Sequence, residues 1–344
     1  MTGERVGVVV AAYQARDLVA DTMASLLAQT HRDWTCVVVD DGSTDDTAEA
    51  VRAAVGGDPR VRVLSQDNRG VSAARNLALA ELPDDTDLVA FLDADDAWTP
   101  TALEVLVRAL RARPDAVGAY GYAEYVDRTG RVMMPGAHRE VQRVRRVLSG
   151  RRLVDLPESA DATFDVLHVA GPIWPSAVGL HRLQAVRRAG SFDATFRNQG
   201  DWDLYVRMSR LGPWVVVPEV VAWYRRHTDN LTADHGATSY HHDRVRHKTW
   251  TSPDNTSRQR RDVARAWRYQ QVAQTRRAAL AARGALLAGD LRAVVQSVAA
   301  ASVQLRQAVR PGPPPARPWR SRLLHAPAAH LGQRGAQPAR PRRT

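Results

Sequence analysis

The chain has 344 residues, of which 44% are hydrophobic and 25% are charged, the composition of an ordinary globular protein. Its single cysteine, Cys36, excludes an intrachain disulfide. No stretch approaches the roughly 20 apolar residues that a membrane-spanning helix needs, and the N-terminus lacks the layout of a signal peptide. We therefore expect a cytoplasmic protein.

The formal net charge of +11 combines two oppositely charged parts of the chain. Residues 251–344 contain 18 Arg and 3 Asp, a net of +15, so residues 1–250 carry −4. A mildly acidic body therefore precedes a strongly basic tail, and the two parts need separate explanations.

The first 92 residues alternate between apolar β-branched runs and helical patterns. Runs of this kind indicate strands that are covered on both faces, and their alternation with helices predicts a doubly wound, mostly parallel α/β sheet. The expected order is strand 6–10, helix 17–29, strand 36–39, a helix through Val55, strand 60–64, a helix carrying Arg75 and Asn76, and strand 87–92.

The second half is less regular. We expect short helices and an active-site loop over the polar residues 138–170 and a helix with Asp201 in its first turn. An Ala- and Arg-rich stretch over 262–309 predicts two helices broken near Gly284 and Gly289, and a disordered tail follows Arg310. The other expected elements are helix 100–112, strand 117–125, strand 176–181, helix 183–188, and short strands 214–217 and 220–225.

Three carboxylates, Asp93, Asp95 and Asp96, directly follow the strand that ends near Leu92. In open α/β sheets, ligands gather outside the carboxyl ends of the strands. Crowded carboxylates repel one another unless a cation lies between them, and hard oxygen ligands suit Mg²⁺ or Mn²⁺. The alternative interpretation is an acidic loop that caps the next helix.

Taken together, the motifs over about residues 4–230 resemble those of the inverting family 2 glycosyltransferases, which have the GT-A fold. The match rests on the order and spacing of Val9-Val10-Ala11-Ala12-Tyr13-Gln14, Leu26-Leu27-Ala28-Gln29-Thr30, Val39-Asp40-Asp41-Gly42-Ser43-Thr44-Asp45-Asp46-Thr47, Gly70-Val71-Ser72-Ala73-Ala74-Arg75-Asn76, Phe91-Leu92-Asp93-Ala94-Asp95-Asp96, Gly200-Asp201-Trp202-Asp203-Leu204 and Tyr224-Arg225-Arg226-His227. The resemblance implies a catalytic domain over 1–235, with a nucleotide-binding half (1–125) and an acceptor half (126–235). A helical extension (236–310) and a disordered Arg/Pro-rich tail (311–344) would follow.

The resemblance also implies roles for individual residues. Asp41 would accept a hydrogen bond from the nucleotide base, Asp93 would contact the ribose, and Asp95 would hold a divalent cation, Mn²⁺ or Mg²⁺, at the diphosphate. Such a cation neutralises the charge that develops on the leaving group. The remaining implied assignments are Ala12 and Tyr13 beside the base, Arg75 near the diphosphate, and His227 near the diphosphate as a second metal ligand.

Asp201 is the expected general base, because an inverting displacement needs a carboxylate to take the proton of the acceptor hydroxyl. The first turn of a helix favours its ionised form, although an N-cap aspartate is the simpler interpretation. The family usually has Glu immediately before this Asp, where this chain has Gly200. Asp203 is the reserve candidate for the base.

The implied reaction moves a sugar from a nucleotide diphosphate-sugar, a UDP-sugar first among them, to a glycan or lipid-linked acceptor in cell-envelope or polysaccharide biosynthesis. The basic tail would attract anionic membrane, at the inner face of which the protein would then lie. The alternative is a solvated tail that binds nothing specific. A sugar-1-phosphate nucleotidyltransferase is disfavoured because residues 11–14 lack a Gly-rich, basic loop. A nucleic-acid-binding protein could use the tail, although no specific nucleic acid is expected, and a sugar-nucleotide-binding protein with degenerate catalysis would share the motifs.

Overall fold

The computed structural model describes residues 4–133, 135–136, 145–149, 152–169, 171–228, 230, 235–310 and 312–313. The chain divides into two compact units. The first comprises Met1–Trp267 with Gly312–Pro318, and the second comprises Arg268–Pro311 with Trp319–Thr344.

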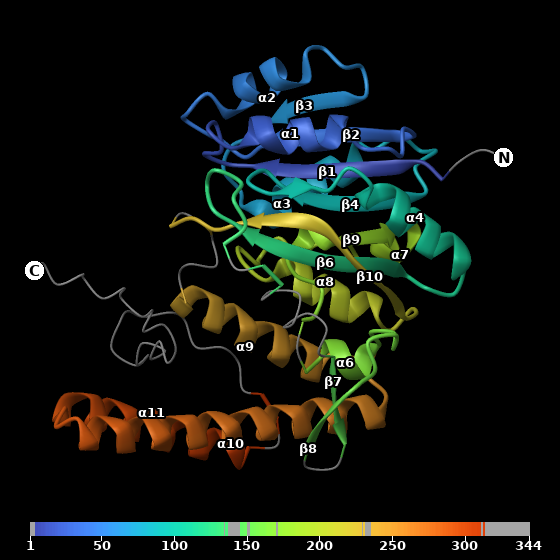
Figure 1. Ribbon diagram of the computed structural model, residues 1–344. Coiled ribbons are helices and arrows are strands. Elements are labelled where there is room, and N and C mark those ends of the chain that lie inside the picture. Colours follow the sequence, from blue (N-terminus) through green and yellow to red (C-terminus); the bar gives the residue numbers. More distant parts are fainter. Residues whose placement is uncertain are drawn as a thin grey trace, which may run out of the picture. The chain divides into compact units, whose positions relative to one another are not determined.

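An eight-stranded sheet in the order β3-β2-β1-β4-β9-β6-β10-β5 forms the centre of the first unit (Figure 1). Its strands β3, β2, β1 and β4 are parallel, β9 runs antiparallel to both β4 and β6, and β10 is parallel to β6. The expected doubly wound, mostly parallel α/β sheet is therefore confirmed. The strands are β1 Val6–Ala12, β2 Trp34–Asp40, β3 Val61–Ser65, β4 Leu88–Asp93, β5 Ala97–Trp98, β6 Gly118–Val126, β9 Gly179–Arg182 and β10 Trp214–Arg225.

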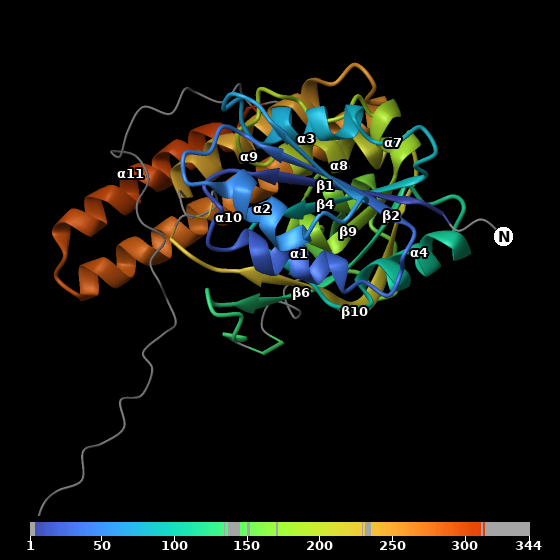
Figure 2. The same ribbon diagram turned by 90° about the horizontal axis from the view of Figure 1, so that it is seen from above.

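Helices cover both faces of this sheet, with α1, α2 and α4 on one face and α3, α7 and α8 on the other (Figure 2). The central strands β1, β2 and β4 are almost entirely buried, which explains their continuous apolar runs. The helices of this unit are α1 Val19–Leu27, α2 Thr47–Val55, α3 Val71–Ala80, α4 Ala102–Ala112, α6 Phe164–Leu167, α7 Leu183–Arg188, α8 Gly200–Met208 and α9 His235–Thr251, with a short 3₁₀ helix η1 at Ser176–Val178.

Two elements differ from the sequence prediction, one in its type and one in its extent. The stretch 176–181 begins as the 3₁₀ helix η1 and becomes strand β9 only at Gly179. The Ala177 carbonyl accepts from the indole of Trp98 at 2.7 Å, so it does not join the strand ladder. The two short strands expected at 214–217 and 220–225 are one strand, β10, with register shifts between Val216 and Ala222. Pro218 lies in this bulge, where its missing N–H is tolerated.

The region 138–170 contains a hairpin of β7 (Arg146–Ser149) and β8 (Arg152–Asp155), followed by α6. Residues 138–144 of this region lie outside the described residues, as do 314–344 of the tail that the sequence predicts to be disordered. The active-site loop expected here therefore stays a prediction.

The first unit continues to Trp267, and the extent of the catalytic domain expected over residues 1–235 stays a prediction. Helix α9 belongs to this unit, and its Lys248 pairs with Asp193 and Asp203. This helix is strongly polar and has no apolar periodicity that would have indicated it.

The second unit contains most of α10 (Ser257–Leu287) and all of α11 (Leu291–Ala308), which run side by side (Figure 1). Gly289 breaks the helix with φ +74°, whereas Gly284 lies inside α10. The Asp290 carboxylate then caps α11 by accepting from the Ala293 N–H at 3.0 Å. Across the described part of the chain, no helix is long and apolar enough to span a membrane.

Candidate active site

The carboxyl ends of β1, β2 and β4 bring the first group of expected residues together. Ala12 pairs with Asp40 across β1 and β2, and Ala11 pairs with Asp93 across β1 and β4. The Asp41 N–H donates to the Ala12 carbonyl at 2.8 Å, which fixes Asp41 beside the loop after β1. In that loop, the side chain of Tyr13 is 53% exposed, so its ring is available to a ligand.

The Asp41 carboxylate organises the loop before α3. Its Oδ1 accepts from Gln66 Nε2 at 2.7 Å and from the Arg69 N–H at 2.8 Å. Its Oδ2 accepts from the Gly70 N–H at 2.8 Å. A carboxylate has about four acceptor positions, so three are used and one position on Oδ2 is left for a further donor. Asp41 therefore stabilises this loop, in addition to any contact that it makes with a nucleotide base.

A continuous chain of hydrogen bonds joins the end of β4 to the start of α8. Arg75 on α3 donates through Nη2 to Asp93 Oδ1 at 2.5 Å and to Ser176 Oγ at 3.1 Å. The Ser176 hydroxyl in turn donates to Asp201 Oδ2 at 3.2 Å. The expected donor-side residue Asp93 and the expected base Asp201 therefore belong to one polar network.

Arg75 is buried, so it is not a helix-surface ion pair. Its guanidinium carbon lies 5.2 Å from the ring centroid of Phe192 and 5.9 Å from that of Phe91. Below it, the imidazole of His181 is fully buried against Phe91, with ring centroids 5.2 Å apart. Burial, and secondarily the positive charge of Arg75, lower the pKa of His181 to about 3.

The side chain of Asp95 points away from this network toward the end of β10. Its Oδ2 lies 3.0 Å from His227 Nε2 and 3.1 Å from Asn230 Nδ2. Asn230 also accepts from the His227 N–H at 2.7 Å, which fixes the loop after β10. The sequence interpretation paired Asp95 with His227, and the structure brings the two together.

The pair of Asp95 and His227 fits a divalent cation. Asp95 Oδ2 and His227 Nε2 share a hydrogen bond of 3.0 Å in this structure. Two neighbouring ligands of one octahedral ion, each about 2.1 Å from it, are also about 3 Å apart. The carboxylate is the hard ligand that Mn²⁺ and Mg²⁺ prefer, and the imidazole is a softer second ligand. No third His, Cys, Asp or Glu completes a cluster within the described residues, and such ions commonly take only one or two protein carboxylates plus substrate phosphates.

Asp96 stabilises the acidic loop after β4 from the inside of the protein. It is fully buried, and its Oδ1 accepts from the Arg225 N–H at 3.0 Å. Burial, followed by the charges of Asp95 and Asp93, raises the pKa of Asp96 well above its usual range. The Thr22 hydroxyl binds the Ala94 and Asp96 carbonyls at 2.9 and 2.7 Å. The third carboxylate of the motif therefore shapes the loop and does not face a ligand.

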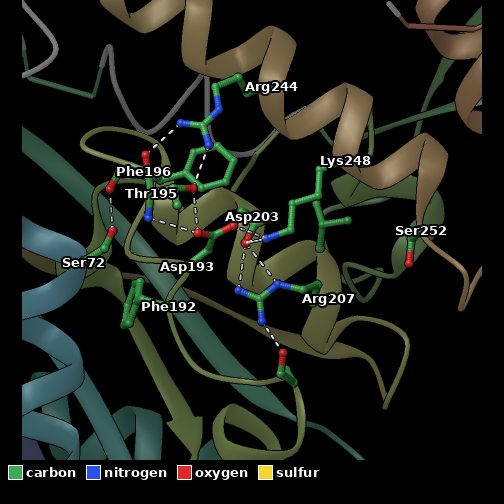
Figure 3. Close-up of polar contacts among 12 residues, drawn as sticks. Ser72, Phe192, Asp193, Thr195, Phe196, Asp203, Arg207, Arg244, Lys248 and Ser252 are labelled. Atoms are coloured by element: carbon green, nitrogen blue, oxygen red, sulfur yellow. Dashed lines mark hydrogen bonds and ion pairs between the residues drawn. The ribbon is translucent and has the colours of Figure 1, made fainter. Parts of the chain in front are cut away.

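Asp201 and Asp203 lie in different environments although they are two residues apart on α8. Asp201 is half-buried. Its carboxylate accepts from the Ser176 hydroxyl at 3.2 Å and from the Trp202 N–H at 2.8 Å. Asp203 is buried, and its Oδ2 forms ion pairs with Arg207 at 2.8 Å and Lys248 at 3.0 Å (Figure 3). Asp203 is thus part of the packing between α8 and α9, and Asp201 is the carboxylate of the pair with an accessible oxygen.

Gly200, the departure from the family pattern, sits where no larger residue fits without a shift. A Cβ at this position would lie 2.6 Å from Ser72 Oγ. That hydroxyl donates to the Phe196 carbonyl at 2.7 Å and so ties α3 to the loop before α8 (Figure 3). A glutamate here would require this contact to move.

Three of the residues that hold the site were assigned no role from the sequence. The sequence predicts Ser176 in a strand, and it gives Arg225 and Asn230 no role in binding or catalysis. Arg225 Nε donates to the Asp95 carbonyl at 2.9 Å, and Ser176 and Asn230 contact Asp201 and Asp95 directly. All these contacts span more than 20 residues, so no local pattern could have identified them.

A sheet of this topology with acidic side chains at the ends of β2 and β4 is the GT-A fold of nucleotide-sugar glycosyltransferases. Two solved structures agree with this assignment. The mannosyltransferase PcManGT from Pyrobaculum calidifontis, in complex with GDP-Man and Mn²⁺, superposes with a TM-score of 0.62 at 22% identity, covering 89% of this chain and 81% of its own. S. aureus TarS 1–349 in complex with UDP-GlcNAc gives a TM-score of 0.59 at 14% identity, covering 89% of this chain and 93% of its own.

The model of the family "Glycosyl transferase family 2" matches residues 7–155. The putative teichuronic acid biosynthesis glycosyltransferase TuaG of Bacillus subtilis is 37% identical over 119 residues. That alignment covers 34% of this chain and 46% of TuaG, so the chain spans less than half of the length of this relative. Over residues 7–155, which are less than half of this chain, the protein is similar to glycosyl transferase family 2.

Proposed function

We propose that this protein transfers a sugar from a nucleotide diphosphate-sugar to an acceptor hydroxyl with inversion at the anomeric carbon. The observation that carries the proposal is the hydrogen-bonded chain from Asp93 through Arg75 and Ser176 to Asp201. It connects the strand end where a donor nucleotide would bind to the one carboxylate of α8 with an accessible oxygen. Positions of both reactants would thereby be set by one rigid network.

The donor would occupy the ends of β1, β2 and β4. We assign the base to Ala12, the exposed ring of Tyr13 and the remaining acceptor position of Asp41, and the ribose to Asp93. Arg75 would carry positive charge toward the diphosphate while holding Asp93. TarS was solved with UDP-GlcNAc and PcManGT with GDP-Man, so the choice of a UDP-sugar rests on the sequence motifs.

Asp95 would hold a divalent cation, with His227 as its neighbour. When bound, Mn²⁺ or Mg²⁺ would neutralise negative charge on the diphosphate leaving group. PcManGT was solved in complex with Mn²⁺, which supports a metal in this fold. Asn230 would orient Asp95 by donating from its amide to Oδ2, and it would fix the His227 backbone by accepting from its N–H.

Asp201 would act as the general base. Its Oδ2 is held by the Ser176 hydroxyl at 3.2 Å, and its Oδ1 accepts from the backbone at 2.8 Å. Each oxygen keeps room for one further hydrogen bond, which the acceptor hydroxyl would donate before its oxygen attacks the anomeric carbon. The proton would end on Asp201, and the nucleoside diphosphate would leave from the opposite face.

The acceptor would be a glycan or a lipid-linked sugar in cell-envelope or polysaccharide biosynthesis. TuaG, by its name, belongs to teichuronic acid biosynthesis, and other matching relatives are named succinoglycan biosynthesis proteins. The proposed location is cytoplasmic, at the inner face of the membrane. Contact of the Arg-rich residues 311–344 with anionic lipid stays a prediction.

A panel of nucleotide sugars tests the proposal by two measurements. A true donor should raise the thermal unfolding temperature, since a ligand stabilises the state that binds it. In the presence of Mn²⁺, the same donor should also be hydrolysed slowly without acceptor. Protection without hydrolysis or transfer would favour a sugar-nucleotide-binding protein with degenerate catalysis, and a panel without any protecting donor would overturn the proposal.

A further inference from the structure

An exposed apolar row runs along α11. Its members Leu291, Val295, Val298, Leu305 and Val309 are between 51% and 83% exposed. They are spaced i, i+4, i+7, i+14 and i+18, which at about 100° per residue places them on one side of the helix. Ser297, on another side, is buried. Five large aliphatic side chains in one line are more than the scattered exposed residues of an ordinary surface.

Arginines flank this row. Arg292 and Arg306 are exposed and lie about 60–100° around the helix axis from the centre of the apolar row, and Arg310, also exposed, follows the end of the helix. A matching row on α10 alternates between the two kinds of side chain at a spacing of i, i+4, i+8, i+11 and i+15. Its members, all exposed, are Val272, Arg276, Leu280, Arg283 and Leu287.

The charge of this segment is strongly one-sided. Residues 268–310 contain seven Arg and one Asp, so the segment carries a net charge of +6. A second copy of the same surface would bring the same charge, which opposes self-association through this face. A nucleic acid would neutralise the arginines but would leave the aliphatic row in water.

An anionic bilayer satisfies both kinds of side chain. Aliphatic residues enter the boundary between headgroups and acyl chains, and arginines beside them bind headgroup phosphates. We propose that the exposed rows of α11 and α10 dock this protein on an anionic lipid bilayer. This surface lies within the described helices and is separate from residues 311–344, and the proposal does not depend on the transferase activity.

Co-sedimentation of the full chain with vesicles tests the proposal. Vesicles of phosphatidylcholine mixed with phosphatidylglycerol should bind the protein, and pure phosphatidylcholine should bind it weakly. The decisive variant combines Leu291→Gln, Val295→Gln and Val298→Gln, which removes the apolar row without changing the charge. It should lower the partition coefficient at least about tenfold, because three aliphatic side chains no longer enter the lipid. Binding of this variant equal to that of the wild type would overturn the proposal.

Two further variants separate the sources of positive charge. Arg292→Gln, Arg306→Gln and Arg310→Gln together should weaken binding to anionic vesicles by about 100-fold, at about a factor of 5 for each arginine near the surface. The matched control is Arg108→Gln, Arg187→Gln and Arg188→Gln, the same charge change on the exposed surface of the first unit. A third variant replaces the arginines of 311–344 by glutamine. If only that variant lost binding, the tail and not the helices would be the docking element.

A fluorescence measurement tests insertion directly. Cys36 is buried and is the chain's single cysteine, so a cysteine introduced at an exposed site can be labelled selectively with a polarity-sensitive dye. A label at Val298→Cys should shift to shorter wavelength on addition of anionic vesicles, and a label at Arg188→Cys should not. An unshifted Val298 label, or a wild type that forms lipid-independent dimers which the apolar-row variant lacks, would contradict the proposal.

Discussion

The hydroxyl of Ser176 donates to Asp201 Oδ2 at 3.2 Å, across 25 residues of sequence. The same hydroxyl accepts from Arg75 at 3.1 Å, so one buried serine separates a fixed cation from the proposed base. A hydroxyl can donate once and accept twice, and here its donor is directed to the carboxylate. Ser176 is therefore a positioning residue for Asp201.

Replacement of Ser176 by Ala tests this relationship. Loss of a hydrogen bond to a charged group costs about 1.5 kcal/mol or more, which is roughly tenfold in rate. We expect kcat to fall by at least that factor while the affinity for nucleotide is nearly unchanged, because Arg75 loses its bond to Ser176 but keeps its ion pair with Asp93. Ser209→Ala is the matched control, since Ser209 is a buried serine after α8 whose hydroxyl donates to the Val206 carbonyl. Unchanged kcat in Ser176→Ala would reject the positioning role.

Asp201→Asn should retain donor binding and lose transfer. The amide keeps the size of the side chain but removes its basicity, and loss of a general base typically lowers the rate by about 10²- to 10⁴-fold. Nucleotide affinity by calorimetry and kcat with acceptor are the two measurements. NMR of the new glycosidic bond gives a separate check, because a single displacement requires the configuration opposite to that of the donor.

Asp203→Asn provides the contrast to Asp201→Asn. Asp203 is buried in ion pairs with Arg207 and Lys248, and breaking a buried pair typically destabilises by about 3–5 kcal/mol. Urea unfolding should therefore show a lower free energy of unfolding, with kcat of the folded protein near that of the wild type. The reverse pattern, a stable protein that has lost transfer, would move the base to Asp203.

Chelation and metal restoration test the pair of Asp95 and His227. Activity should disappear in excess chelator and return with Mn²⁺ or Mg²⁺. Asp95→Ala should abolish the effect of the cation on nucleoside diphosphate affinity, which calorimetry measures without turnover. Asp85→Ala, an exposed carboxylate paired with Arg5, is the control. Full turnover in chelator would exclude a role for the metal.

Much of the sheet was predictable because its central strands are buried on both faces. The runs at Val6 and Cys36 are apolar throughout, so their structure is encoded locally. Helix α9 was not predictable, because it is polar and has no apolar periodicity, and its Lys248 pairs with Asp203, 45 residues away. The 3₁₀ helix at Ser176 likewise depends on the Trp98 indole, a partner 79 residues away.

The candidate site shows the same division. Asp41, Asp93 and Asp95 lie at or just after the ends of strands, so their common location could be inferred from the parallel sheet alone. Their partners could not be inferred, because Asn230 lies 135 residues from Asp95 and Ser176 lies 101 residues from Arg75. The structure also separates Asp201 from Asp203 by environment, a distinction that two neighbouring carboxylates on one helix do not reveal in sequence.

His181 should make the fold sensitive to mild acid. Its pKa is lowered to about 3 in the folded protein by burial, whereas an unfolded chain binds the proton near its ordinary value of 6.5. Between these values the unfolded state holds more protons, so stability is complete above pH 6.5 and falls as the pH falls. Between pH 7.5 and pH 5.0, His181 should lower the free energy of unfolding by about 2 kcal/mol.

His181→Phe isolates this contribution from that of other histidines. Phenylalanine keeps the ring contacts with Phe91 and Trp214 but cannot bind a proton. Urea unfolding of both proteins at pH 7.5 and 5.0 should show a loss of stability in the variant that is smaller by about 2 kcal/mol. Equal losses in the two proteins would mean that His181 is not the group that titrates on unfolding.

Gly200 should tolerate no side chain while Ser72 keeps its hydroxyl. The Cβ of Gly200→Ala would lie 2.6 Å from Ser72 Oγ, which is held by its hydrogen bond to the Phe196 carbonyl. Either that bond breaks or α8 shifts with Asp201, and overpacking of this kind typically costs about 1–3 kcal/mol. Urea unfolding and kcat should therefore both decline in Gly200→Ala.

A double-mutant cycle between these two positions separates the clash from other effects of the methyl group. Ser72→Ala removes the hydroxyl that the new Cβ would meet, so Gly200→Ala should cost much less stability in that background than in the wild type. We expect a coupling free energy of about 1 kcal/mol or more, as for residues in direct contact. Additive losses would show that the missing glutamate of the family pattern has a cause other than the hydroxyl of Ser72.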